Sequence, residues 1–206
     1  MKVGIICEGR LGGEDAQLFE HFAKRIVPNA SVKAFPQGTK PELIAEAGDV
    51  AASLFATGYT RVLIMWDIMP RFGRPDGEQQ DTQDIQASLA SAGMAAHPCL
   101  FLIAIHKELE AWLLADGTAL STVLSRPAHP VAIPHTKNAD TVTNPKKRLE
   151  KLFEQYNVPF GPQPMQGIYQ PKLAAIRIAE QIPANFGQLG KIGSFKKFGR
   201  SLMATC

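Results

Sequence analysis

The fold is decided by residues 2–9, KVGIICEG, and by two later stretches that are built in the same way. Each is a short apolar run with the length of a buried strand, and each is followed by acidic residues. These acids are Glu8 after residues 3–7, Asp67 after residues 62–66, and Glu108 with Glu110 after residues 99–105. In an open parallel α/β sheet, ligands bind beyond the carboxyl ends of the strands. The acids therefore mark a candidate binding edge.

Segments with helical spacing of apolar residues separate these strands and a further strand at residues 31–35. The expected helices cover residues 14–26, 41–57, 81–92 and 108–115, and residues 69–80 form a Pro- and Gly-rich loop without periodicity. This alternation predicts an α/β fold with a mainly parallel sheet of four strands, or slightly more, and helices on both faces. We assign residues 1–116 to this core. Residues 117–206 are expected to form a helical, basic extension packed on it, with helices near residues 118–124, 145–156, 172–182 and 194–203.

Composition favours a cytoplasmic globular protein. Of the 206 residues, 45% are hydrophobic and 20% are charged, which is ordinary for a soluble domain. The longest apolar run is about seven residues, far below the roughly 20 that span a bilayer, and the N-terminus lacks a signal-peptide pattern. Three cysteines, Cys7, Cys99 and Cys206, are odd in number and lack the spacing of metal ligands. They are predicted to be free thiols in a reducing compartment.

Charge is distributed unevenly along the chain. Residues 1–144 hold 12 Lys and Arg against 16 Asp and Glu, a net charge of −4. Residues 145–206 hold 10 Lys and Arg against 3 Asp and Glu, a net charge of +7. A basic segment beside an acidic pocket suits a polyanionic substrate. A solvated helical surface would give the same pattern, and for any single lysine this is the simpler interpretation.

The acids at the strand ends suggest a divalent cation, because gathered carboxylates repel one another unless a cation lies between them. Mg²⁺ prefers one or two carboxylates together with water and phosphate oxygens. Glu8 and Asp67 meet that need if their strands are neighbours; otherwise Glu8 is an exposed turn residue and Asp67 caps a loop. Glu108 and Glu110 point about 200° apart on a helix, so only one faces the pocket. We favour Glu110, with Glu108 as a first-turn acid that suits the helix dipole.

Several other site classes are not supported. The glycines at residues 9–13 do not form the G-x-G-x-x-G fingerprint of dinucleotide sites, and no G-K-[ST] motif of a P-loop is present. Serine and cysteine residues have no evident His and Asp partners, so a hydrolase triad is not expected.

The ordered motifs of this chain resemble those of the TOPRIM-like proteins, the fold of topoisomerases, primases and nucleases of the overcoming-lysogenization-defect type. The similar segments span nearly the whole chain. They are Glu8-Gly9, Asp67, IHKELEAWLLAD (105–116), NPKKRL (144–149), Tyr169 with Lys172, and SFKKF (194–198). The later segments are similar to a bacterial subgroup that is often encoded beside AAA- or ABC-type ATPases.

This resemblance implies roles for the acids. In the family the first-strand Glu has an acid/base or metal role, which corresponds to Glu8. A later Asp-x-Asp pair binds Mg²⁺, and its first member corresponds to Asp67, whereas Met69 occupies the second position. Asp76, Asp81 or Asp84 could replace the missing Asp. Glu14 or Asp15 could supply the acid that usually follows the Glu-Gly turn.

The sequence thus leads to a hypothesis with one alternative. The leading hypothesis is a phosphodiester hydrolase that uses Mg²⁺ or Mn²⁺ and acts on DNA or RNA. The resemblance implies a role in anti-phage defence with an ATPase partner. Its catalytic and metal-binding residues are Glu8, Asp67 and Glu110. The expected substrate-binding residues are Arg10, Lys146, Lys147, Lys172, Lys196 and Lys197. The alternative is a non-catalytic TOPRIM-like partner or regulator of an ATPase, and a flavodoxin-like nucleotide-binding or phosphotransfer protein fits the first turn less well.

Overall fold

The computed structural model describes residues 1–71, 73, 77–156 and 171–206, without the side chains of residues 171–173. Contacts divide the chain into two compact units. Unit 1 comprises Met1–Ile105 and Lys197–Cys206, and unit 2 comprises His106–Lys196. The boundary at residue 116 that the sequence predicts therefore lies inside unit 2. The last ten residues of the chain, Lys197–Cys206, belong to unit 1.

Unit 1 is built on a four-stranded sheet in which every pair of neighbouring strands is parallel. The strands are β1 (Lys2–Cys7), β2 (Ser31–Pro36), β3 (Arg61–Asp67) and β4 (Leu100–Ile105), in the order β2-β1-β3-β4. The central strands β1 and β3 are buried over almost their whole length, whereas the edge strand β2 alternates at its start between exposed and buried residues. The continuous apolar runs thus form the middle of the sheet.

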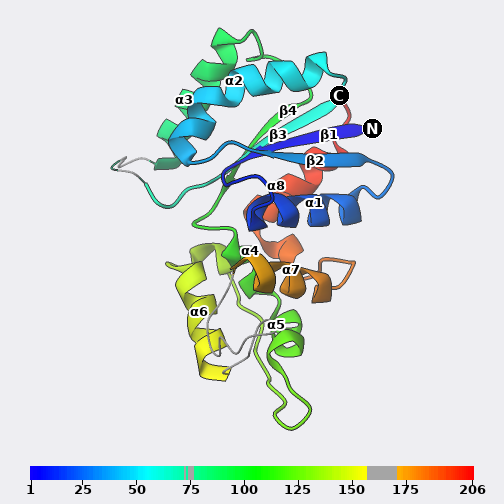
Figure 1. The fold of residues 1–206 in the computed structure, drawn as a ribbon, viewed down its shortest axis with the longest axis vertical. Helices are drawn as coiled ribbons and strands as arrows, with labels where there is room; N and C mark the ends of the chain where they lie inside the picture. The colour runs from blue at the N-terminus through cyan, green and yellow to red at the C-terminus, as the bar shows by residue number, and fades with distance from the viewer. Residues whose placement is uncertain (72, 74–76, 157–170) are drawn as a thin grey trace. The chain divides into compact units, whose positions relative to one another are not determined.

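Helices cover both faces of this sheet, as the alternating pattern predicts (Figure 1). On one face, α2 (Lys40–Ala56) and α3 (Gly77–Ser91) enclose a core in which Leu43 and Ile85 pack beside Ile64 of β3. On the other face lies α1 (Glu14–Ile26). Phe19 of α1 is in ring contact with Phe198, at 6.4 Å between centroids. The predicted α/β fold with a mainly parallel sheet is confirmed.

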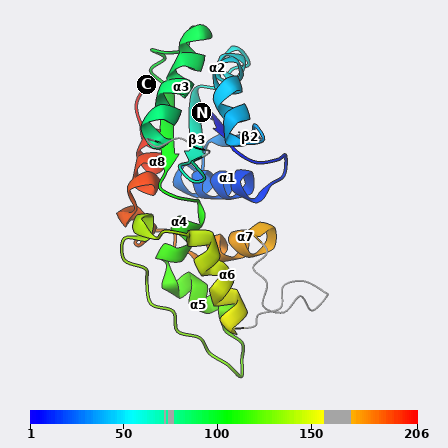
Figure 2. The same ribbon diagram turned by 90° about the vertical axis from the view of Figure 1, so that its left-hand side faces the viewer.

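Unit 2 is helical, with α4 (Glu110–Ala115), α5 (Gly117–Leu124), α6 (Pro145–Tyr156) and α7 (Pro171–Gln181). The described residues of unit 2 also form two short 3-10 helices, η1 (Ala139–Thr141) and η2 (Leu189–Lys191), and α8 (Gly193–Met203) begins there. Trp112 is fully buried, its indole N–H donates to the Ser194 hydroxyl at 2.9 Å, and its ring meets Phe195 edge-on. A view turned by 90° shows the same helices from the side (Figure 2).

Two local expectations differ from the structure. The loop predicted at residues 69–80 is shorter, because α3 begins at Gly77 instead of Asp81. The helix predicted from residue 108 begins at Glu110. Lys107 before it has a φ of 72°, in the left-handed region, which is incompatible with a helix that runs through this position.

Two of the three cysteines are bonded to each other, so their prediction as free thiols is wrong. Cys99 and Cys206 form a disulfide with a Cα–Cα distance of 5.3 Å, across a sequence separation of 107 residues. Sequence spacing cannot reveal such a pair, because the chain end returns to the start of β4 only in the fold. Beside it, the Arg61 guanidinium donates to the carbonyl oxygens of Leu202 and Ala204. Cys7 remains a free, buried thiol.

Removing this disulfide should weaken the fold without changing it. We expect Cys206→Ser to lower the free energy of unfolding by about 2–4 kcal/mol, because a cross-link that closes a long loop restricts the unfolded chain. Urea unfolding under non-reducing conditions measures the change. Dithiothreitol should destabilise the wild-type protein by a similar amount and leave Cys206→Ser unaffected; equal stability of the two oxidised proteins would argue against the bond.

Among the helices that the structure describes, none combines the length and the apolar character that a membrane span requires.

Candidate functional site

The strand order brings Glu8 and Asp67 to adjacent positions at one edge of the sheet. Cys7 of β1 is in register with Met65 of β3, so the chain leaves both strands side by side. The connection from β1 leads outward to β2 on one side, and β3 leads to β4 on the other. The crevice between β1 and β3 is therefore the topological switch point, where ligands of open α/β sheets bind.

Glu8 and Asp67 are joined by a hydrogen bond. The Asp67 backbone N–H donates to Glu8 Oε1 at 2.9 Å, so the Glu8 side chain turns toward the end of β3. Burial raises the pKa of Glu8 to about 7, against the opposing effects of this hydrogen bond and of the nearby Lys40. A carboxyl group with this pKa exchanges its proton near neutral pH, which is the property of a general acid or base.

A buried lysine, which the sequence analysis missed, lies beside these acids. Lys40, the first residue of α2, is 2% exposed, and its ammonium donates to the carbonyl oxygens of Ile68 and Pro70 at 2.9 and 3.0 Å. Its Nζ is 3.4 Å from the Asp81 carboxylate, which is fully buried in α3. Both charges of this pair act on Glu8. The protein therefore has a positively charged side chain, the Lys40 ammonium, at this edge of the sheet.

Lys40 also fixes the segment that follows Asp67. Because its two carbonyl partners belong to residues 68 and 70, the backbone after β3 is tied to the start of α2. The signal in the sequence is weak: a lysine at the first position of a helix opposes the helix dipole, so it needs an acidic or carbonyl partner nearby. Of the acids proposed to replace the missing Asp, Asp81 is the partner of Lys40, Asp84 lies in α3, and Asp76 is outside the described residues.

Asp15 is a further acid at the same end of β1. A Cβ placed on Gly9 would lie 3.8 Å from its carboxylate, so this side chain turns toward the loop after the strand. Gly9 has a φ of 106°, which only glycine adopts readily, and it pairs with Gly38 through two backbone hydrogen bonds. Burial, followed by the charges of Asp15 and Glu8, raises the pKa of the Cys7 thiol far above its usual range. Cys7 is therefore not a nucleophile here.

Ionisation of Glu8 should lower stability as the pH rises. The pKa of Glu8 in the folded chain is about 7 against an ordinary 4.5, so the folded state holds the proton more tightly between these values. The free energy of unfolding therefore falls as the pH rises from 4.5 to about 7. Above this pH the full destabilisation by the Glu8 charge is present. We expect Glu8→Gln in EDTA to be more stable than the wild type at pH 8 by on the order of 2–3 kcal/mol, and equal to it at pH 4.

Thermal and urea unfolding across this pH range measure the effect. Glu46→Gln, which changes an exposed residue of α2, is the matched control and should leave the pH profile unchanged. Parallel profiles for Glu8→Gln and the wild type would show that Glu8 titrates normally.

The remaining predicted site residues are distributed over both units. Glu110 begins α4 in unit 2, so its part in the site of unit 1 stays a prediction. Glu108 precedes α4, and its carboxylate accepts the Lys146 backbone N–H at 3.1 Å, in the first turn of α6. The predicted substrate-binding residues Arg10, Lys146, Lys147, Lys196 and Lys197 are exposed, and the side chain of Lys172 in α7 is outside the described residues.

The acids at this edge suit Mg²⁺ only if water and substrate oxygens supply its remaining ligands. Among the described residues, no group of three or more His, Cys, Asp or Glu side chains is arranged to hold a metal ion. Glu8 and Asp67 are two acids from neighbouring strands, joined through the Asp67 backbone N–H, and Mg²⁺ commonly takes one or two carboxylates with water and substrate phosphate as its other ligands. A closed site made of protein ligands alone is not present in the described part of the chain.

Fold and site together define a parallel α/β protein with two adjacent acids at its switch point. The chain belongs to the family described as "Domain of unknown function (DUF4276)", whose match covers residues 16–185. This match includes β3 with Asp67 and most of unit 2, and Glu8 precedes it. Comparisons with curated proteins and with solved structures gave no significant match.

Proposed function

We propose that this protein is a metal-dependent phosphodiester hydrolase that acts on DNA or RNA. The observation that carries the proposal is the hydrogen bond from the Asp67 backbone N–H to the Glu8 carboxylate, which sets two acidic residues side by side at the switch point between β1 and β3. Two neighbouring acidic residues at a ligand-binding edge suit a divalent cation with a phosphate group as its further ligand. The resemblance of the ordered motifs to TOPRIM-like proteins supports the same chemistry.

In this proposal Asp67 and Glu8 hold Mg²⁺ or Mn²⁺, and Glu110 is a further candidate ligand. Such an ion, when bound, would polarise the phosphate and lower the pKa of a water molecule. Because a metal ligand must be deprotonated, binding at Glu8 would compete with its proton below pH 7. Lys40 would keep the loop after Asp67 in place and offset part of the negative charge that enters with a phosphate.

The exposed basic residues would hold the nucleic-acid backbone. Arg10 follows Glu8 by two residues, within the loop that leaves β1. Lys146 and Lys147 lie on α6, and Lys196 and Lys197 on α8. Contacts of this kind carry no sequence preference, and they weaken as the salt concentration rises.

The proposed setting is the cytoplasm, in anti-phage defence with an AAA- or ABC-type ATPase as partner, as the resemblance implies. In a reducing cytoplasm the Cys99–Cys206 bond would be opened, and the hydrogen bonds of Arg61 would hold the end of the chain.

One observation favours a non-catalytic partner or regulator of an ATPase instead. The Lys40 ammonium already lies among the acids and acts on Glu8, so the site is partly neutralised without a metal ion. Met69 also stands where the TOPRIM-like pattern has its second Asp. In this second candidate function, the edge of the sheet would bind a ligand without cleaving it.

A nuclease assay separates the two functions. Purified protein is incubated with plasmid DNA, single-stranded DNA and tRNA, each with Mg²⁺, Mn²⁺ or EDTA. Cleavage that requires the metal supports the hydrolase. Absence of cleavage, both alone and with a co-expressed ATPase, together with retained metal-independent binding of nucleic acid, would favour the binding function.

A further inference from the structure

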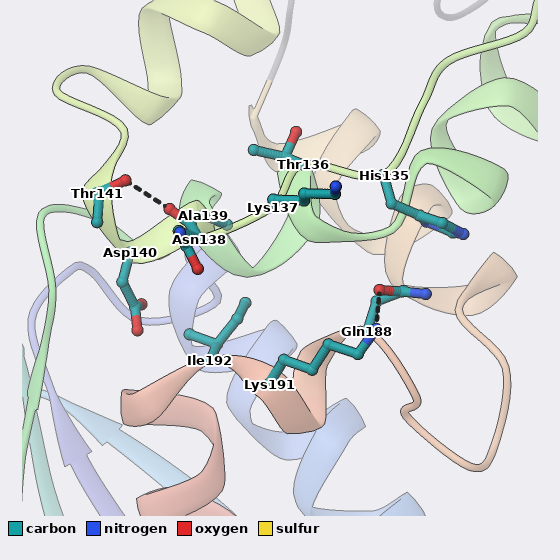
Figure 3. Close-up of a pocket in the computed structure, with 10 residues that line it drawn as sticks. All are labelled: His135, Thr136, Lys137, Asn138, Ala139, Asp140, Thr141, Gln188, Lys191 and Ile192. Carbon is teal, nitrogen blue, oxygen red and sulfur yellow. Dashed lines mark hydrogen bonds between the residues drawn. The ribbon is translucent and has the colours of Figure 1, made fainter.

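Unit 2 contains a pocket that is separate from the residues of the acidic pair. Its volume is about 500 Å³, within the range of sites for small-molecule ligands. One wall is the segment of residues 135–141, which ends in η1, and the other is formed by Gln188, Lys191 and Ile192 around η2 (Figure 3). All of these residues belong to unit 2.

The polar groups of the two walls face a common space. Figure 3 shows the His135 ring and the Lys137 ammonium on one side, with Gln188 and Lys191 opposite them. The Lys191 ammonium donates to the Gln188 side-chain oxygen at 3.0 Å, and Lys137 has no ion pair among the described residues. His135 Nδ1 accepts the Gly117 backbone N–H at 3.1 Å, which fixes the ring. Two ammonium groups thus lie at this pocket, and no acid of the described residues forms an ion pair with either.

Asp140, the single acid among the described residues of the lining, is engaged in the wall itself. Its Oδ2 accepts the backbone N–H of Gly193, the first residue of α8, at 2.8 Å. Its Oδ1 is buried and has no hydrogen-bond partner among the described residues. Both oxygens are therefore directed into the wall, and a carboxylate at a helix N-terminus is stabilised by the helix dipole. Asp140 positions the wall and leaves the two lysines as the accessible charges.

The wall is also held in one conformation before any ligand arrives. Asn138 is in the left-handed region with a φ of 52°. Its carbonyl oxygen accepts both the backbone N–H and the hydroxyl of Thr141 at 2.8 Å. A pre-formed turn lowers the entropic cost of binding, because the lining does not have to be ordered by the ligand.

We propose that this pocket binds a small molecule that carries a phosphate group. A phosphate dianion matches the two ammonium groups of Lys137 and Lys191, and the Gln188 amide can donate to a third oxygen. Ile192 and Ala139 provide apolar surface for the remainder of the ligand. A nucleic-acid strand is the weaker fit, because it requires a row of cations along a groove, whereas this pocket has two.

Titration of the ¹⁵N-labelled full chain with pyrophosphate in EDTA tests the proposal. We expect saturable shifts of backbone amides in residues 135–141 and 188–192. Lys137→Gln and Lys191→Gln should each weaken binding about tenfold. Lys151→Gln changes an exposed lysine of α6 outside the pocket and is the matched control. The Glu8→Ala Asp67→Ala variant should bind pyrophosphate like the wild type, so a failed nuclease assay would not affect this result.

Three results would overturn the proposal. The first is the absence of a saturable shift of these amides up to about 10 mM pyrophosphate, because a dissociation constant above this concentration would mean no specific binding. The second is equal binding by the wild type and the double variant Lys137→Gln Lys191→Gln. The third is a stronger response of the same amides to succinate, or to a single-stranded oligonucleotide, which would replace the small phosphorylated ligand by a carboxylate or a nucleic acid.

Discussion

Cleavage of nucleic acid is expected to fall at least ~100-fold in Asp67→Asn, because an amide is a far poorer ligand than a carboxylate for a hard cation. The substitution should leave the fold intact. The hydrogen bond to Glu8 comes from the backbone N–H of residue 67, so the new side chain does not remove it. Gel-based initial rates in Mg²⁺ measure the effect, with circular dichroism as the check on folding.

Asp49→Asn is the matched control for this experiment, since it makes the same chemical change at an exposed position of α2. Its cleavage rate should equal that of the wild type. Glu8→Ala should be as defective as Asp67→Asn if the two acids hold one ion. Full activity in both Asp67→Asn and Glu8→Ala would exclude the switch-point acids as the catalytic site.

The largest loss of stability is expected from Lys40→Met. Removing this ammonium takes the Lys40 ion pair away from the fully buried Asp81 carboxylate, and breaking a buried pair from one side costs about 3–5 kcal/mol. Two carbonyl oxygens, those of Ile68 and Pro70, also lose their donor. Urea unfolding at pH 7 measures the difference from the wild type.

Two further variants distinguish the effect of breaking the buried ion pair from the effect of losing a lysine side chain. Lys24→Met removes an exposed lysine that pairs with Glu20 at 2.9 Å, and it should cost less than about 1 kcal/mol. The double variant Lys40→Met Asp81→Leu should recover part of the loss, because it removes the buried carboxylate together with the ammonium. A loss below about 1 kcal/mol in Lys40→Met would show that the pair is not desolvated as the structure describes.

The strands and their acids could be predicted because local sequence encodes them. A run such as residues 62–66 has the length and composition of a buried strand, which places Asp67 at its end. The order of the strands could not be predicted, because any of several orders buries the same apolar surface. That Glu8 and Asp67 are neighbours is thus a result of the fold.

The residues that were missed depend on contacts between distant segments. Lys40 looks like a surface lysine in the sequence, and only the approach of α3 and the loop after β3 buries it. Cys206 meets Cys99 through the return of the chain end to the sheet. The pocket of unit 2 combines residues about 50 positions apart in ordinary polar sequence, without a motif to indicate it.

Unit 2 is an insertion in the sequence of unit 1, which is therefore discontinuous. Residues 106–196 separate β4 from the last ten residues of the chain. The disulfide between Cys99 and Cys206 joins the two segments of unit 1 directly. A single cut within the insertion would therefore break the main chain without separating those segments while the bond is oxidised. Glu8, Lys40 and Asp67 all precede the insertion, so these three residues lie in one continuous stretch of the sequence.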